Sequence, residues 1–463
     1  MLNTRVVAHR ARKALVPSLV GLALVALCPG TVHANGAFPA VSQLVSDPSD
    51  QAHLVLRSNF GLLITHDAGT SWDWVCEAGL GYQNIEPAIA LLGDGTTIAA
   101  LPNGIARGDT ECSFGLVNGV SDYVADVARV PSDPGNVAAV AVSVQIDDGV
   151  SQVWRSLDAG KSWTRLGIAL NDFSATTLDA AADARSTLYV SGVSQSDAVT
   201  GVLARSTDGG ETWTRWSIPF VNKTSAPYIA AIAASTVYVR LSGSPGKLLV
   251  SRDGGEHWAG ALDFEGPLDG FALSPDGRFA LASGRSDGVW RARTSELAFE
   301  RVSCTKLRCL SWTNSGLFAC ADEYQAGFLV GQSTDLGASF EPRLNLSCVR
   351  GPLACGSESA VAQACYASWP AQSEILGNDC ANAGFTPRDD CSNTAGATAG
   401  ASGTAGAGSS LAGAAGSGRQ VGWRASGGCS MSSSPTSRWG LLIALATWFA
   451  GIGRRRLRPE KTR

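Results

Sequence analysis

Histidine is scarce in this chain, with five residues among 463. Two of them fall in an N-terminal segment that we expect to be removed, which leaves His53, His66 and His257. Paired C-x-x-C motifs are missing as well. Because protein zinc sites are built mainly from cysteine and histidine, the sequence predicts no metal site and no other cofactor. Serine–histidine catalysis is equally unsupported.

Positive charge is in short supply once the two ends of the chain are set aside. The chain has 36 Lys and Arg against 40 Asp and Glu. Residues 1–34 and the residues after Cys429 hold 11 of the basic side chains and one acid, so the body between them has 25 basic and 39 acidic groups, a net charge of −14. Such a surface repels phosphate backbones, and we therefore expect no nucleic-acid partner.

Long apolar runs are missing too. The two clearest runs, Ala14–Leu27 and Trp439–Gly453, have 14 and 15 residues, fewer than the roughly 20 that a transmembrane helix needs. The first follows four basic residues and precedes Val-His-Ala, an order typical of a secretory signal peptide, which we expect to span residues 1–34. An uncleaved N-terminal anchor is the alternative.

One short pattern, by contrast, is repeated along most of the chain. Its clearest copy has Ser206, Asp208, Gly210, Thr212 and Trp213 in the order S-x-D-x-G-x-T-W. Four further copies are centred on Asp67, Asp158, Asp253 and Asp335, and two weaker ones on Asp109 and Thr294. The seven central positions are 41 to 50 residues apart, a spacing typical of β-propeller blades.

The chemistry of the repeat predicts a turn between two strands. The aspartate can accept hydrogen bonds from backbone N–H groups further along the turn, and the glycine allows a positive φ. The pattern resembles the Asp-box, or BNR, repeat of sialidases and related β-propellers, where the box joins the third and fourth strands of a blade. The resemblance implies an all-β, seven-bladed propeller over residues 35–346, with six blades as the alternative. It also implies that the box aspartates are structural.

Cysteine usage favours an oxidising compartment. Of twelve cysteines, ten remain after Cys28 and Cys429 are set aside, which is enough for five disulfides. A hairpin centred on residues 313–316 would place Cys309 opposite Cys320. The second prediction is a disulfide between Cys76 and Cys112, because these residues lie on neighbouring repeats.

Beyond the repeats we expect three further segments. Residues 347–392 hold five cysteines and are interpreted as a disulfide-linked appendage on the last blade, with a separate binding module as the alternative. Residues 393–428 are rich in Ala, Gly, Ser and Thr and predict a flexible linker. Residues 429–463, with Cys429, an apolar stretch and an arginine cluster, resemble the MYXO-CTERM sorting tail of myxobacterial surface proteins, which implies attachment to the cell envelope.

The resemblance places a ligand site on the face opposite the boxes, in the loops before the first strand and between the second and third strands of each blade. Carboxylates and aromatic side chains in those loops are the candidate contacts: Tyr82, Tyr123, Asp147, Asp148, Asp322, Glu323 and Tyr324. An ordinary solvated acidic rim is the alternative interpretation of the same residues.

We therefore expect a secreted, envelope-attached protein that binds a glycan or a surface protein without catalysis. The competing hypothesis is a sialidase-like or xyloglucanase-like glycoside hydrolase in which Asp148 and Asp322 act as acid and base. Against a sialidase, the early R-I-P segment of that family is absent from the sequence.

Overall fold

The computed structural model describes residues 38–182, 186–195, 199–233, 235–313, 315–377 and 379–382. The predicted signal peptide, the linker and the C-terminal tail with Cys429 lie outside these residues. Among the described helices, none is both long enough and apolar enough to cross a lipid bilayer.

Seven sheets account for the strands of the described residues, and each contains four antiparallel strands that follow one another in sequence. Blade 1 contains β1 (Val41–Ser46), β2 (Leu54–Ser58), β3 (Gly61–Thr65) and β4 (Trp72–Cys76), and blade 2 contains β5 (Ile89–Leu91), β6 (Thr97–Leu101), β7 (Gly104–Thr110) and β8 (Ser113–Leu116). Blade 3 contains β9 (Tyr123–Arg129), β10 (Ala139–Gln145), β11 (Val150–Ser156) and β12 (Thr164–Arg165), and blade 4 contains β13 (Phe173–Ala180), β14 (Leu188–Ser194), β15 (Gly201–Ser206) and β16 (Thr214–Ile218). Blade 5 contains β17 (Pro227–Ala233), β18 (Thr236–Leu241), β19 (Gly246–Ser251) and β20 (Ala259–Phe264), and blade 6 contains β21 (Leu268–Leu273), β22 (Phe279–Gly284), β23 (Gly288–Arg293) and β24 (Glu300–Ser303). Blade 7 contains β25 (Leu307–Thr313), β26 (Gly316–Ala321), β27 (Val330–Ser333) and β28 (Glu341–Leu344).

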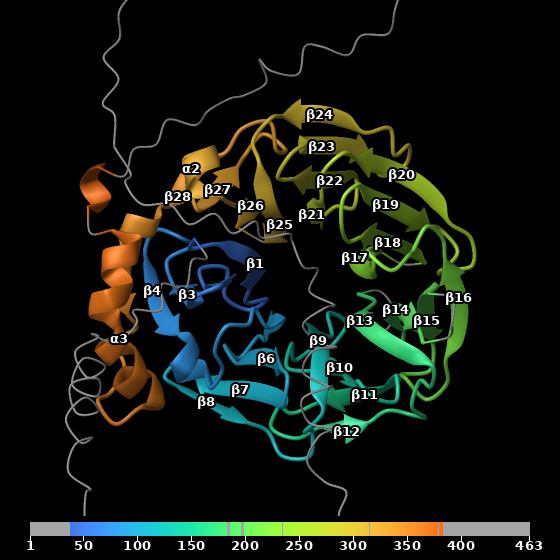
Figure 1. Ribbon diagram of the computed structural model, residues 1–463, viewed down its shortest axis with the longest axis horizontal. Helices are drawn as coiled ribbons and strands as arrows, with labels where there is room; N and C mark the ends of the chain where they lie inside the picture. The colour runs from blue at the N-terminus through green and yellow to red at the C-terminus, as the bar shows by residue number, and fades with distance from the viewer. Residues whose placement is uncertain are drawn as a thin grey trace, which may run out of the picture. The chain divides into compact units, whose positions relative to one another are not determined.

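The first strands of the blades line the centre of a ring (Figure 1). Each of these inner strands contacts the inner strands of the blades on either side, and β1 contacts β25, so the ring is closed. The second and third strands are buried on both faces, because each sheet packs between two others. One core cluster, for example, joins Ile98 and Ile105 of blade 2 to Val127 and Trp154 of blade 3. The seven-bladed propeller prediction is confirmed.

A β-bulge near the start of most inner strands turns one side chain toward the next blade. In β1, β9 and β13 the side chain of the residue just after the bulge accepts a hydrogen bond from a backbone N–H group of the next blade. The three bonds run from Ile89 to Gln43 at 3.1 Å, from Leu178 to Asp126 at 2.9 Å and from Ile229 to Thr177 at 2.8 Å. At the same position of β21 stands Gly270, where an added Cβ would lie 2.8 Å from the N atom of Leu310. Adjacent blades are thus joined at their inner edges, through hydrogen bonds from backbone N–H groups to side chains or, at Gly270, through the close approach of the two backbones.

The ring is closed at its outer edge by the segment that follows blade 7. After η3 (Leu346–Cys348), strand β29 (Val349–Pro352) pairs parallel to β4 and becomes the fifth strand of blade 1. Glu323, in the short helix α2 (Glu323–Ala326), is buried and accepts hydrogen bonds from the side chain of Asn345 and from the N–H of Leu346. This carboxylate fixes the point where the chain leaves blade 7.

The Cys-rich appendage lies on blades 1 and 2. Its helix α3 (Ala360–Leu376) packs against β4, β8, β29 and the short helix η2 (Glu77–Leu80), and η4 (Cys380–Asn382) follows. The expectation that the appendage would sit on the last blade was wrong, because β29 carries the chain across from blade 7 to blade 1. In Figure 1 the orange α3 lies beside the blue β4.

Disulfides hold this closure in place. The predicted Cys309–Cys320 pair is present in the β25–β26 hairpin. The predicted Cys76–Cys112 pair is wrong: Cys76 is bonded to Cys365 and Cys112 to Cys355, so both blades are linked to the appendage instead of to each other. A fourth disulfide, Cys348–Cys380, lies within the appendage.

Candidate functional site

Five clear box turns connect the third and fourth strands of blades 1, 3, 4, 5 and 7. In blade 3 the carboxylate of Asp158 accepts hydrogen bonds from the N–H and the hydroxyl of Ser162, at 3.0 and 2.6 Å, and from the hydroxyl of Ser156 at 2.8 Å. The indole N–H of Trp163 donates to the carbonyl of Gly160 at 3.0 Å. Asp67, Asp208, Asp253 and Asp335 occupy the same position in their turns.

These contacts give the box aspartates a structural role. Hydrogen bonds from the hydroxyl and the N–H of Ser162 lower the pKa of Asp158 to about 2, because they stabilise its charged form. The hydroxyl and the N–H of Thr212 likewise lower the pKa of Asp208. Since these carboxylates are engaged in their own turns, they are not free to contact a ligand.

The two weak copies do not form box turns. In blade 2, β7 runs through Asp109 to Thr110, and only two residues separate it from β8. Asp109 forms an ion pair with Arg107. In blade 6 the hydroxyl of Thr294 donates to the carbonyl of Gly277 at 2.6 Å. The repeat period was therefore sufficient to identify these blades even where the turn chemistry is lost.

Six of the seven candidate ligand residues lie in the predicted kinds of loop, whereas Tyr123 is the first residue of strand β9. Two of the six are buried. Tyr82 is 8% exposed, and burial raises the pKa of its hydroxyl. Glu323 is 4% exposed and holds the exit from blade 7. Burial removes both residues from the set of surface contacts. Tyr324, in contrast, is 58% exposed on α2.

The two carboxylates considered as an acid–base pair are not brought together. Asp148 lies in the β10–β11 turn of blade 3, whereas Asp322 is the N-cap of α2 in blade 7 and accepts a hydrogen bond from the N–H of Tyr324 at 3.1 Å. Two blades separate them on one side of the ring and three on the other. Glycoside hydrolysis by paired carboxylates requires a separation of roughly 5 to 10 Å.

Three of the candidate residues, Tyr123, Asp147 and Asp148, lie together on blade 3. The carbonyl of Gly149 in the β10–β11 turn accepts a hydrogen bond at 2.8 Å from the N–H of Phe173, at the start of blade 4. This contact joins two loops of neighbouring blades into one surface. We call it the loop surface, and it comprises Tyr123, Ile146, Asp147, Asp148, Ile168 and Asp172, all of them exposed. Ile146 and Ile168 are 52% and 77% exposed, so apolar and acidic groups alternate there.

Inner-strand carboxylates also have shifted pKa values. Burial raises the pKa of Asp126 to about 7 and that of Asp179 to about 6. Both accept backbone hydrogen bonds, Asp126 from Val127 and Leu178 and Asp179 from Ala180. Through these bonds Asp126 links β9 to β13, and Asp179 is held to the backbone of its own strand.

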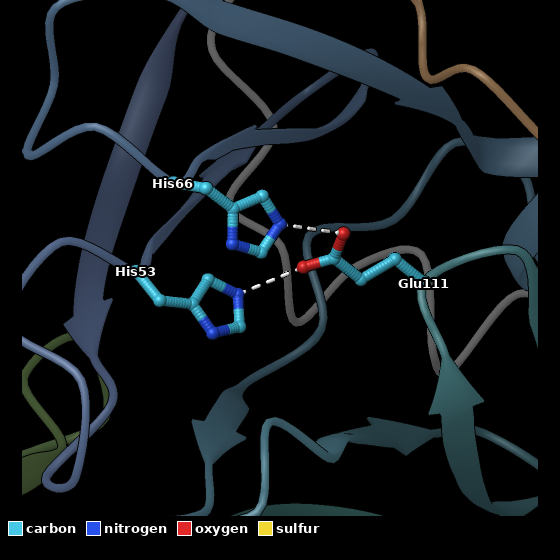
Figure 2. A group of neighbouring side chains, drawn as sticks. All are labelled: His53, His66 and Glu111. Carbon is cyan, nitrogen blue, oxygen red and sulfur yellow. Dashed lines mark hydrogen bonds and ion pairs between the residues drawn. The ribbon is translucent and has the colours of Figure 1, made fainter.

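Sequence reasoning missed one cluster of side chains, on the face that carries the box turns. Figure 2 shows His53 and His66 of blade 1 directed at the two carboxylate oxygens of Glu111 in blade 2. The distances are 2.8 Å from His53 Nε2 to Oε1 and 2.9 Å from His66 Nε2 to Oε2. The imidazole rings are stacked, with centroids 4.4 Å apart. A cavity of about 370 Å³ opens beside them.

A signal for this cluster was present in the repeat register. His66 immediately precedes the box aspartate Asp67, and Glu111 stands at the glycine position of the weak box in the next blade. Equivalent turns of adjacent blades lie side by side at one end of a propeller. Aligning the repeats and comparing neighbouring copies would therefore have placed these two side chains close together.

Comparison with known proteins supports the fold. Residues 204–215 match the BNR/Asp-box repeat family. No curated protein matches this chain. Among solved structures, an ancestral GH74 enzyme is similar with a TM-score of 0.50 and 15% identity over 66% of this chain and 46% of that one. This chain thus spans about half the length of that enzyme.

Two further solved structures have lower scores. The GH74 xyloglucanase from Xanthomonas campestris gives a TM-score of 0.29 at 15% identity, over 69% of this chain and 57% of that one. YCF48 bound to D1 peptide gives 0.41 at 13% identity, over 60% of this chain and 88% of that one. The similarity to the ancestral GH74 enzyme, at 15% identity, supports a common propeller fold alone.

Proposed function

We propose that this protein is a secreted, envelope-attached binding module whose loop surface holds a glycan. The observation that carries the proposal is the register of β9 with β10, which pairs the exposed Tyr123 with Val144, three residues before Asp147 in the β10–β11 turn. The same turn is joined to the start of blade 4 by the Gly149–Phe173 hydrogen bond. Aromatic rings pack against the C–H faces of sugars, and carboxylates accept hydrogen bonds from sugar hydroxyls. Neither contact requires a reaction.

The competing function is glycoside hydrolysis. The GH74 enzymes among the similar structures are glycan-related propellers, which favours a glycan as the ligand but does not choose between binding and catalysis. The placement of Asp148 and Asp322 in separate blades supports binding. A surface-protein partner remains the other class of ligand for the same loops.

A glycan array probed with the purified protein tests the proposal. We expect Tyr123→Ala and Asp148→Asn to weaken binding at least tenfold. Leu157→Ala provides the matched control, because Leu157 is 67% exposed in the box turn of the same blade, at the opposite end of its strands. Equal binding by all four proteins, or binding to no glycan, contradicts the proposal. Turnover of a polysaccharide that is lost in Asp148→Asn supports the hydrolase instead.

Envelope attachment has a separate test. We expect the mature protein to begin at Asn35 and to be processed near Cys429, which intact-mass measurement of protein from the native cell envelope would detect. A mature chain that still ends at Arg463 contradicts the sorting-tail proposal.

A further inference from the structure

We propose that His53, His66 and Glu111 form a binding site for a divalent transition-metal ion, with Zn²⁺ as the best-matched ion. The site joins blade 1 to blade 2 on the box face, away from the loop surface, so it stands independently of the proposed glycan binding. One ligand atom from each residue lies within 4.8 Å of the others. Two imidazoles and one carboxylate are a ligand set that zinc enzymes use, with a further position left for water.

The unsatisfied atoms of the cluster are the first argument. The side chain of His53 is 5% exposed and that of Glu111 is 16% exposed. His53 Nε2 and Glu111 Oε1 are 2.8 Å apart and form an ion pair when His53 is protonated, whereas with a neutral His53 neither atom has a hydrogen-bond partner within the described residues. Buried polar atoms without partners are rare in folded proteins and require an explanation. An ion bound to both the nitrogen and the oxygen, about 2 Å from each, would satisfy both.

The second argument is the support behind His53. The carboxylate of Asp47 is buried and accepts hydrogen bonds from the N–H groups of Ser49 and Asp50 at 2.7 and 3.2 Å. Its other oxygen lies 3.4 Å from Nδ1 of His53. A carboxylate on the far nitrogen of a histidine keeps the proton there and leaves Nε2 as a lone-pair donor, as in many metal sites.

Charge around the cluster is the third argument. The cavity beside the two histidines is lined by Asp47, Asp50, Asp94, Asp109 and Glu111, and among its lining residues there is no lysine or arginine. Asp109 is paired with Arg107, but the other four carboxylates around the opening create a negative potential that attracts cations. Imidazole ligands favour Zn²⁺ and other transition metals over Ca²⁺ and Mg²⁺, which prefer oxygen atoms alone.

A second group, Asp253, Glu256 and His257, shows what distinguishes this site. It also contains a histidine beside a box aspartate, with His257 Nδ1 at 2.7 Å from Asp253 Oδ2. All three side chains are exposed, and Asp253 accepts the hydrogen bonds of its own turn. His257 therefore offers a matched control: a histidine in an equivalent turn that has a carboxylate partner but no burial.

The experiment uses the full-length protein, stripped of metal with a chelator and titrated with Zn²⁺ by calorimetry. We expect one ion per chain, a melting temperature that rises with zinc concentration, and Co²⁺ absorption bands typical of a four-coordinate nitrogen–oxygen site. His66→Ala, a change at a half-exposed side chain that should leave the fold intact, should weaken binding at least 100-fold. His257→Ala should bind like the unmodified protein.

Asp47, whose carboxylate lies beside Nδ1 of His53, gives an independent readout. Asp47→Asn should weaken zinc binding about 10- to 100-fold while leaving the stoichiometry at one. Circular dichroism and melting of each metal-free variant verify that it is folded. Absence of stoichiometric zinc binding, binding that His66→Ala leaves unchanged, or a stronger response to Ca²⁺ than to Zn²⁺ overturns the proposal.

Discussion

The two disulfides that link the appendage to blades 1 and 2 should be partly redundant, so that each stabilises the ring less when the other is present. Cys76–Cys365 and Cys112–Cys355 close loops of 289 and 243 residues, so each spans nearly the whole propeller. When both are present, either one closes only a short additional loop, made of the 36 residues from Cys76 to Cys112 and the 10 from Cys355 to Cys365. Removing one disulfide therefore costs less than removing the last one.

The chain-entropy relation gives the magnitudes. An effective loop of about 46 residues corresponds to about 4 kcal/mol for the first disulfide removed, and the remaining long loop to about 5.6 kcal/mol. We expect Cys76→Ala/Cys365→Ala and Cys112→Ala/Cys355→Ala each to lower the free energy of unfolding by about 4 kcal/mol, and the fourfold variant to lower it by about 9.6 kcal/mol. The excess over additivity is thus about 1.6 kcal/mol.

Denaturant unfolding followed by tryptophan fluorescence would measure these differences. The Cys309–Cys320 disulfide is the control, since it closes a loop of 11 residues inside one hairpin. Its removal should cost about 2.8 kcal/mol and add independently to either of the others. Strict additivity of the two appendage disulfides, or a fourfold variant as stable as the double variants, would refute the proposal that they share one closure.

Three further outcomes follow from named contacts. Asp158→Ala, which removes the acceptor for three hydrogen bonds of its turn, should lower the free energy of unfolding by about 1–3 kcal/mol, whereas the exposed Asp147→Ala should not change it measurably. The pKa of Asp158 falls from 3.8 to about 2 on folding, so the stabilisation by its carboxylate is complete above about pH 4 and is lost as the pH falls through 2. The melting temperature should drop over that pH window, and an unchanged melting temperature would contradict the prediction. Gly270→Ala should destabilise by about 1–3 kcal/mol because its Cβ would meet the backbone of Leu310, while Gly115→Ala, with no atom within 4 Å, should be neutral by the same unfolding assay.

Local chemistry explains how far the sequence predicted the site. The box aspartates were identified because their partners lie within four residues, so the turn is specified by a contiguous stretch such as Ser156 to Ser162. The Cys309–Cys320 pair was predicted for the same reason, as one hairpin register determines it. The loop residues were assigned to the correct connections, yet exposure separated Tyr123 and Asp148 from the buried Tyr82 and Glu323.

The sequence by itself determined the number of blades, their strand order and the chemistry of the five clear box turns, because all of these depend on contacts between residues close together in the chain. Only the tertiary structure decided which blades the appendage covers and that Cys76 pairs with Cys365, since those contacts depend on where β29 crosses the ring. It also decided that His53, His66 and Glu111 meet. Their meeting requires two blades to pack side by side, and no single repeat contains that information.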